Sequence, residues 1–225
     1  MKYVLTTEAL CKRYKKTNAL DDFYMHVPKG AIYGFIGKNG AGKTTLIRMI
    51  CGLSNPTSGS YTLYGIKNSD KEMEQTRRHM GAVVETPALT LEMTAEENLR
   101  QQYRIYGLSS FDGIGKLLEL VGLEKAGKKK VKAFSLGMKQ RLGIAMALAC
   151  EPDFLVLDEP TNGLDPQGII ELRELILELN HEKGITFLIS SHILDELARV
   201  ATHYGIIDQG KMLREFLSFL SSFLL

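Results

Sequence analysis

The stretch that decides the fold is Gly37-Lys38-Asn39-Gly40-Ala41-Gly42-Lys43-Thr44, which has the spacing G-x-x-x-x-G-K-[ST]. Its glycines allow the backbone to curl so that successive N–H groups point inward at phosphate oxygens. Apolar residues 31–36 predict a strand before it, and residues 42–52 predict a helix after it, whose N-terminus favours an anion. We therefore expect a phosphate-binding loop in which Lys43 reaches the β- and γ-phosphates of a nucleotide and Thr44 ligates Mg²⁺.

An apolar run that ends in two carboxylates follows later in the chain. Residues 154–157 are all apolar, and Asp158 and Glu159 come directly after them. In an open α/β sheet, ligands bind at the carboxyl ends of the strands. Asp158 is therefore expected to hold Mg²⁺, directly or through water, and Glu159 to polarise the water that attacks the γ-phosphate. Alone, this run would favour a helix cap or a turn, but a preceding phosphate-binding loop favours the catalytic interpretation.

The remaining apolar runs predict an α/β body. Short runs without alternation, at residues 81–85, 185–189 and 204–208, are typical of strands buried on both faces of a parallel sheet. Helical patterns lie at residues 167–182 and 192–201. This alternation of strands and helices favours an α/β fold.

Three parts of the chain differ from this body. Residues 1–28 and 59–65 partly alternate, which predicts a small antiparallel sheet beside the main one. The middle block lacks a clear strand, and its Thr94 and Glu97 form a capping-box helix start. The predicted division of the chain (1–225) is a core at 1–87 and 151–212, a helical insertion at 88–150 and an apolar tail at 213–225. Apolar residues recur at helical spacing in that tail, which packs on the body, meets a partner or is a truncation edge; the sequence leaves all three open.

The composition is that of an ordinary globular protein. Hydrophobic residues make up 44% and charged residues 24% of the 225, which excludes disordered and fibrous classes. The formal net charge of only +2 does not indicate a basic surface that would bind nucleic acid. The three cysteines are far apart, so neither a disulfide framework nor a zinc site is expected. We recognise no signal peptide and no run of about 18 apolar residues, so we expect a cytoplasmic protein that meets a membrane through a partner.

Four further segments complete the pattern. Residues 135–141 read Ser-Leu-Gly-Met-Lys-Gln-Arg and precede the acidic strand, and residues 163–166 read Gly-Leu-Asp-Pro and follow it. His192 closes the next strand, and Tyr14 lies before the phosphate loop. In this order and spacing, the segments closely resemble the ATP-binding subunit of an ATP-binding-cassette (ABC) transporter, over about residues 3–211. Taken singly, His192 would be a helix-start histidine, Tyr14 a packing aromatic and Ser135 an N-cap, so only the joint spacing supports the resemblance.

The resemblance implies a P-loop NTPase core of the ABC type, with a role for each matched residue. The implied nucleotide-binding residues are Tyr14, Gly37, Lys38, Asn39, Gly40, Ala41, Gly42, Lys43, Thr44, Thr45, Ser135, Gly137 and Asp165. The implied catalytic residues are Lys43, Glu159 and His192, and the implied metal ligands are Thr44, Asp158 and Glu85. In this family Tyr14 would stack on adenine, and His192 would contact the γ-phosphate. Ser135 and Gly137 would contact the ATP held by the opposite subunit of a head-to-tail dimer.

This sequence departs from the family's pattern at two places. Leu136 and Met138 replace a glycine and a glutamine of the usual Ser-Gly-Gly-Gln signature. Glu85 stands where most relatives have a glutamine, so its carboxylate would bind Mg²⁺ more tightly or repel the γ-phosphate. Together these variants resemble the branch that exports, or confers immunity to, antimicrobial peptides of the lantibiotic and bacitracin types. A merely tolerated variation at Glu85 stays as the alternative.

The resemblance also implies an activity and partners. We expect a Mg²⁺-dependent ATPase, with ATP and Mg²⁺ as ligands, that powers a membrane-spanning transporter subunit from the inner face of the cell membrane. No nucleic acid partner is expected. A groove near residues 85–106, with Pro87, Leu89 and Tyr103 as candidates, is expected to take a short helix of that subunit. The alternative is that these residues fill the core of the insertion.

Two other functions stay open at this point. A soluble ABC-type ATPase would act in DNA repair or on ribosomes, but the chain has one cassette and no long heptad region. A nucleotide-binding module that has lost hydrolysis would fit the altered signature. The presence of Glu159 and His192 disfavours that interpretation.

Overall fold

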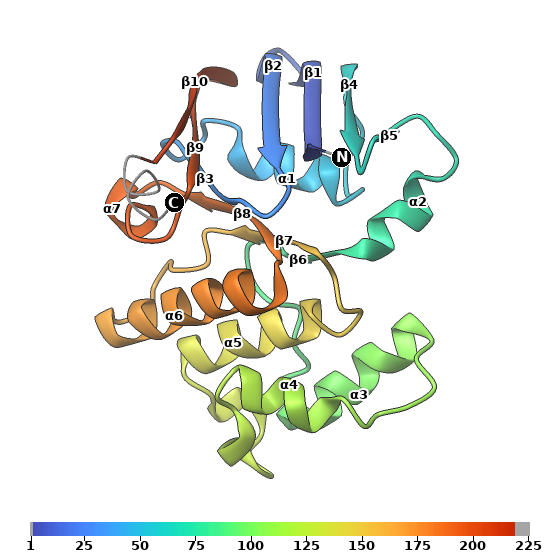
Figure 1. The fold of residues 1–225 in the computed structure, drawn as a ribbon, viewed down its shortest axis with the longest axis vertical. Coiled ribbons are helices and arrows are strands. Elements are labelled where there is room, and N and C mark those ends of the chain that lie inside the picture. The colour runs from blue at the N-terminus through green and yellow to red at the C-terminus, as the bar shows by residue number, and fades with distance from the viewer. Residues whose placement is uncertain (1, 219–225) are drawn as a thin grey trace.

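The computed structural model describes residues 2–218, and its main element is a six-stranded sheet (Figure 1). In spatial order the strands are β10 (Lys211–Leu217), β9 (His203–Asp208), β3 (Ile32–Ile36), β8 (Thr186–Ser191), β7 (Phe154–Asp158) and β6 (Met80–Val83). β9 to β6 run parallel, and β10 pairs antiparallel with β9. Every residue of β7 and β8 is buried, as their continuous apolar runs predict. The predicted α/β class is confirmed.

A second sheet lies above the first and encloses α1 (Figure 1). Its order is β2 (Thr17–Pro28), β1 (Tyr3–Tyr14), β4 (Ser58–Leu63) and β5 (Ile66–Lys67), and all its pairs are antiparallel. α1 (Lys43–Ile50) buries Leu46, Ile47, Met49 and Ile50 in the core shared by the two sheets. This packing fixes the helix that begins at the phosphate loop.

Helices cover the other face of the central sheet (Figure 1). They are α3 (Ala95–Tyr106), α4 (Ile114–Leu120), α5 (Leu136–Ala147), α6 (Pro166–Lys183), α7 (Leu194–Leu197) and the short 3₁₀ turns η2 (Glu124–Ala126) and η3 (Val131–Ala133). The short helix α2 (Met73–Thr76) and the 3₁₀ turn η1 (Arg77–His79) lie instead on the side of the antiparallel sheet, where Met73 belongs to the core around α1. α5 and α6 lie next to the sheet, and α3 and α4 lie beyond them. Within residues 2–218, no helix has the length and apolar character needed to cross a membrane.

The middle block is helical, as its sequence predicts. Between residues 88 and 150 the structure contains α3, α4 and α5, and its extended pairing is limited to a single bridge between Thr94 and Lys130. The predicted capping box starts α3: the Glu97 N–H donates to the Thr94 hydroxyl, and the Thr94 N–H donates to the Glu97 carboxylate at 2.7 Å.

The helical spacing of the C-terminal tail is misleading. Residues 211–217 form the edge strand β10, whereas residues 219–225 lie outside the described residues. Gln209 and Gly210 both have positive φ angles, as a tight hairpin between two twisted strands requires. The Phe216 ring then stacks on Tyr204 with centroids 5.1 Å apart. The described part of the tail that begins at residue 213 is therefore a strand despite its helical spacing, because the hairpin aligns these apolar residues with β9.

The helix predicted at residues 192–201 is also shorter than expected. α7 spans only Leu194–Leu197, because Ile193 keeps an extended backbone with φ of −117° and ψ of 112°. His192 therefore lies between the end of β8 and α7 rather than inside a helix. This extended connection leaves its side chain free to face the end of β7.

Candidate functional site

The phosphate loop joins β3 to α1 at the carboxyl edge of the central sheet. A Cβ atom at Gly37 would lie 2.5 Å from the Ile207 carbonyl oxygen, so only glycine fits there. Gly42 has a φ of +116°, and a Cβ would lie 2.5 Å from the Ala19 carbonyl oxygen. Gly42 is also the N-cap of α1 and provides no side-chain cap. The first N–H groups of α1 are thus left for an anion, as predicted for this loop.

Lys43 is held inside this loop. Its side chain is only 5% exposed, and its Nζ donates to the carbonyl oxygens of Gly37 and Lys38, the latter at 3.2 Å. The same Nζ lies 3.1 Å from Glu159 Oε1. A buried ammonium needs such partners, and these orient it along the loop. Lys43 is therefore fixed where a phosphate oxygen would meet it.

Asp158 ends β7 next to the loop and carries a buried oxygen that lacks a partner. The residue is 1% exposed, and its Oδ1 accepts a hydrogen bond from the Ser190 hydroxyl at 2.6 Å. Its Oδ2 is buried and has no hydrogen-bond partner among the described residues. An unpaired buried acceptor is costly unless something else satisfies it. A divalent cation with oxygen ligands fits that requirement.

Glu159 bridges the loop and His192. Its backbone has a φ of 50°, and its N–H donates to the Ser190 hydroxyl oxygen at 2.8 Å. Its Oε2 lies 2.7 Å from His192 Nδ1 and accepts the His192 N–H at 3.3 Å. Since Oε1 lies next to Lys43, one carboxylate contacts both the lysine and the histidine. The structure thus gathers the three predicted catalytic residues into one cluster.

The other predicted nucleotide-binding residues, those of the loop and Tyr14 outside it, are exposed to different degrees. Thr44 and Thr45 are partly buried in the first turn of α1, and Lys38, Asn39 and Gly40 are exposed. Ala41 is buried. Tyr14 ends β1 and is 47% exposed, with Lys12 Nζ 5.1 Å from its ring centroid. An exposed ring at this place leaves a face open for stacking.

The predicted signature residues lie elsewhere, at the start of α5. Ser135 is exposed and caps this helix, because its hydroxyl accepts the Met138 N–H at 3.2 Å. A Cβ at Gly137 would lie 3.8 Å from Leu164, in the segment that carries Asp165. Asp165 in turn caps α6 by accepting the Gly168 N–H at 3.0 Å. Within one chain, the described contacts bring the signature next to this segment and not next to Lys43.

Glu85, a predicted metal ligand, pairs with an arginine in this structure. The residue follows β6, has a φ of 59° and is exposed, and its Oε1 lies 2.8 Å from an Arg48 guanidinium nitrogen. Among residues 2–218, no three His, Cys, Asp or Glu side chains lie close enough to share a metal ion. Glu85 is therefore not gathered with Asp158 and Glu159 in this conformation.

A hollow of about 320 Å³ adjoins Glu85, where a partner groove is predicted. Its lining residues come from the ends of α1 and β6, from α3 and from α5: Leu53, Ala82, Val83, Val84, Thr86, Pro87, Ala88, Gln102, Tyr106, Gly143, Met146 and Ala147. Pro87, one of the three residues predicted for the partner groove, lines this hollow. Leu89 instead packs against the main core, and the predicted Tyr103 lines another hollow.

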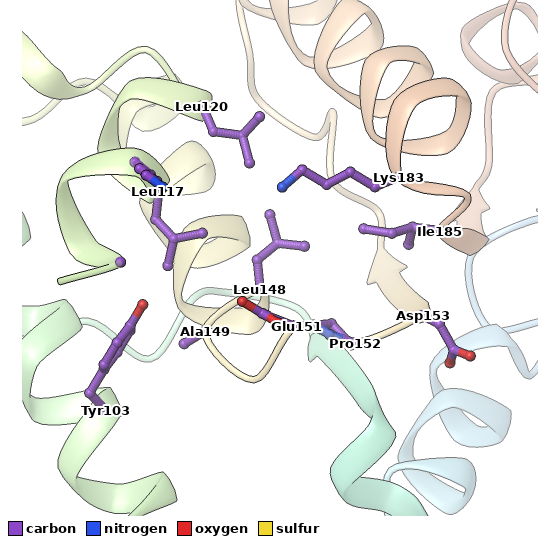
Figure 2. Close-up of a pocket in the computed structure, with 12 residues that line it drawn as sticks. Tyr103, Leu117, Leu120, Leu148, Ala149, Glu151, Pro152, Asp153, Lys183 and Ile185 are labelled. Atoms are coloured by element: carbon purple, nitrogen blue, oxygen red, sulfur yellow. The ribbon is translucent and has the colours of Figure 1, made fainter. Parts of the chain in front are cut away.

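That other hollow, of about 490 Å³, lies at the amino-terminal ends of β7 and β8 (Figure 2). α3 contributes Tyr103, α4 contributes Leu117, and the end of α6 contributes Lys183. Burial raises the pKa of the Tyr103 hydroxyl, and the nearby Glu151 raises it further. None of the predicted nucleotide-binding or catalytic residues lines this hollow, so we place the candidate site at the opposite edge of the sheet.

Two further residues, which no sequence motif indicated, belong to this region in the structure. Ser190 bonds to both acidic residues at the end of β7, and Arg48 pairs with Glu85. Ser190 had a visible signal, since Ser190-Ser191 interrupts an otherwise apolar strand. Arg48 had none, because it looks like an ordinary exposed residue of a helix.

The chain matches the protein family described as ABC transporter over residues 20–162. The bacitracin transport ATP-binding protein BcrA of Bacillus licheniformis is 48% identical to it, over 96% of this chain and 70% of that protein. The lantibiotic transport ATP-binding protein SrtF of Streptococcus pyogenes is 44% identical, over 94% of this chain and 90% of that protein. These relatives are transport proteins, which disfavours the alternative of a DNA-repair or ribosomal ATPase.

Solved structures agree with this assignment. The subunit cbiO1 of Clostridium perfringens, part of the ABC transporter complex cbiONQ, has a TM-score of 0.85 and 29% identity, covering 100% of this chain and 92% of that one. The cassette MJ0796, a dimer in a post-hydrolysis state with ADP and phosphate, has a TM-score of 0.83 and 26% identity, covering 95% of this chain and 98% of that one. The chain thus belongs to the ABC transporter family, as one of its ATP-binding subunits with ATPase activity.

Proposed function

We propose that this chain binds ATP at the carboxyl edge of its central sheet, together with Mg²⁺, and hydrolyses it with Glu159 as the water-activating residue. The observation that carries the proposal is the position of Glu159, between Lys43 and His192 and directly after Asp158. The open N-terminus of α1 supports phosphate binding at the same place.

Each residue of the cluster has a distinct task in this proposal. Thr44 and Asp158 would hold Mg²⁺, which neutralises phosphate charge when bound, and the unpartnered Asp158 Oδ2 fits that use. Lys43 and the loop N–H groups stabilise negative charge on the phosphoryl oxygens. The Glu159 carboxylate accepts a proton from the attacking water, and His192 orients that carboxylate and contacts the γ-phosphate.

The direct test is the Glu159→Gln variant. It keeps the shape of the side chain but removes the base, so we expect ATP binding to persist while phosphate release falls by about a hundredfold or more. Glu92→Gln is a matched control, because Glu92 is an exposed carboxylate that pairs with Lys132. Unchanged phosphate release from Glu159→Gln would overturn the assignment of Glu159.

The same proposal includes a head-to-tail dimer with two ATP molecules at its interface. Ser135 and Gly137 are exposed or partly exposed and lie away from the loop of their own chain, so they are free to meet the ATP of a second copy. Helix α5 would then direct its N-terminus at that γ-phosphate, as favours anion binding. The dimeric cassette MJ0796 supports this arrangement.

We further propose that the chain docks on the inner face of a membrane through a membrane-spanning subunit. The hollow lined by Val84, Thr86 and Pro87 would receive a short helix of that subunit. The hollow adjoins the end of β6, where the chain passes from the α/β core into the helical block. A movement of the helical block relative to the core would therefore change the shape of the hollow. Copurification of a membrane protein with Glu159→Gln, and its loss in Thr86→Arg, would support this; equal recovery in both would contradict it.

The cargo proposed for the whole transporter is an antimicrobial peptide of the bacitracin or lantibiotic type. The support is the similarity to BcrA and SrtF, since the substrate path would lie in the membrane subunit. Deletion of this chain from its cell should lower the inhibitory concentration of such a peptide several-fold, and restoring the wild type but not Glu159→Gln should reverse it. Unaltered sensitivity to both peptide types would contradict this cargo.

A further inference from the structure

The ion pair between Arg48 and Glu85 joins two parts of the molecule that the candidate site depends on. Arg48 belongs to α1, the helix that starts with Lys43 and Thr44. Glu85 lies just beyond β6, between Val84 and Thr86, which both line the hollow of about 320 Å³. The Arg48 guanidinium nitrogen and Glu85 Oε1 are 2.8 Å apart, so the contact is direct.

The backbone conformation of Glu85 indicates that contacts with neighbouring residues hold its side chain in place. Its φ of 59° is in the left-handed region, which a side chain other than glycine adopts at an energetic cost. The carboxylate turned outward by this backbone meets Arg48 and, in the described residues, is not grouped with Asp158 and Glu159. Because Val83 of β6 pairs with Leu157 of β7, Glu85 lies beyond the same sheet edge as Asp158 and Glu159, and the ion pair determines where its negative charge lies there.

We propose that Arg48 is a positioning residue that neutralises Glu85 and holds its carboxylate away from the bound phosphates. A carboxylate that swings toward the phosphate loop repels the nucleotide, and the arginine prevents this. Both side chains are about half exposed, at 47% for Arg48 and 53% for Glu85. Pairs this exposed contribute little to stability, so the role we assign is electrostatic placement and not support of the fold. The inference rests on the proposed nucleotide site.

A double-mutant cycle in the Glu159→Gln background tests this role without relying on turnover. ATP affinity is measured with EDTA and with Mg²⁺ for the parent, Arg48→Gln, Glu85→Gln and the double variant. In Arg48→Gln the Glu85 carboxylate is unpaired and repels the phosphates, and solvent screens this repulsion as it screens a partly exposed ion pair. We therefore expect Arg48→Gln to weaken Mg²⁺-free ATP binding about three- to fivefold. The double variant should bind ATP as Glu85→Gln does. Added Mg²⁺ should reduce the loss in Arg48→Gln, since a freed carboxylate also attracts the cation.

The control is Arg100→Gln, which breaks an equally exposed ion pair with Glu96 on α3. It should leave ATP affinity unchanged. If Arg48→Gln weakens ATP binding equally with and without Glu85, Arg48 acts as a distant positive charge and the inference is wrong. It is also wrong if Arg48→Gln has no effect. A parent that binds no ATP at all would overturn the proposed function itself.

Discussion

The carboxyl edge of the central sheet and the start of α5 both carry predicted nucleotide-binding residues, but only the first is assembled within one chain. At the sheet edge, Lys43 and His192 both contact Glu159, and Lys43 is buried. At the start of α5, Ser135 is exposed and bonds only to its own helix among the contacts described. The sheet edge thus has its charged residues already in contact, whereas the start of α5 presents an exposed surface that a second chain could contact.

This difference suggests separate tasks for the two regions: the sheet edge binds ATP, and the start of α5 completes the site of another chain. A half-site that is complete in the monomer can bind ATP by itself. In the proposed dimer, a half-site that is exposed in the monomer contributes only when a second copy approaches, and the ATP held by the first half-site would contact both chains. Mutations in the two regions should therefore have different effects on binding and on turnover.

The largest expected effect is that of Lys43→Ala. The substitution removes the buried ammonium and leaves Glu159 without its cation, so we expect ATP affinity and phosphate release each to fall by roughly a hundredfold. Isothermal titration and a phosphate-release assay measure these. Lys67→Ala, at an exposed strand position, is the control. Retained ATP affinity in Lys43→Ala would break the claim that the sheet edge binds the nucleotide.

Ser190→Ala should have the next largest effect. It removes the hydroxyl that donates to Asp158 and accepts the Glu159 N–H, so we expect turnover to fall about tenfold with a higher Mg²⁺ requirement. Thr7→Val is the matched control, because Thr7 is a buried hydroxyl that donates to the Phe23 carbonyl oxygen, far from the acidic pair. Equal turnover in both variants would show that Ser190 only supports packing.

Ser135→Ala sharpens the comparison between the two regions. Loss of an N-cap costs about 1 kcal/mol, and Thr94→Ala at the start of α3 removes a similar cap. Both variants should therefore lose comparable stability in urea unfolding. Only Ser135→Ala should also lower turnover, by about fivefold, while ATP binding to the monomer stays unchanged. If Thr94→Ala and Ser135→Ala have the same turnover, Ser135 does not act at the γ-phosphate.

The smallest effect concerns the pH dependence of the α3 cap. The Thr94 N–H donates to the Glu97 carboxylate and holds its pKa below the ordinary value. A group with a lowered folded-state pKa stabilises the protein above its unfolded pKa and loses that contribution as the pH falls. The stability difference between wild type and Glu97→Gln should therefore shrink from pH 7 to about pH 3. A difference that is constant with pH would contradict this, and Ser135 provides the contrast because its cap has no carboxylate.

Local motifs account for what the sequence predicts well. The phosphate loop, the acidic end of β7 and the capping box at Thr94 each lie within a few consecutive residues, so spacing alone indicates their geometry. Features that depend on distant contacts are missed. Arg48 and Glu85 are far apart in sequence and meet only in the fold, in which α1 contacts β7 and β7 pairs with β6. Ser190 likewise meets Asp158 only because β8 pairs with β7.

The C-terminal edge strand shows the same limit. The apolar residues of β10 fit a helical period as well as a strand, and only the pairing of Phe216 with Tyr204 across a hairpin decides between them. The turn at Gln209 and Gly210 was the local signal for that hairpin.

The measurement that tests the central claim most directly is the mass of Glu159→Gln in solution with and without ATP. If one half-site is complete and the other needs a second chain, the variant should be a monomer without nucleotide and double its mass when ATP is added. Lys43→Ala introduced into the same variant should abolish this change. A mass that stays monomeric at saturating ATP, or a dimer that forms equally without ATP, would contradict the account.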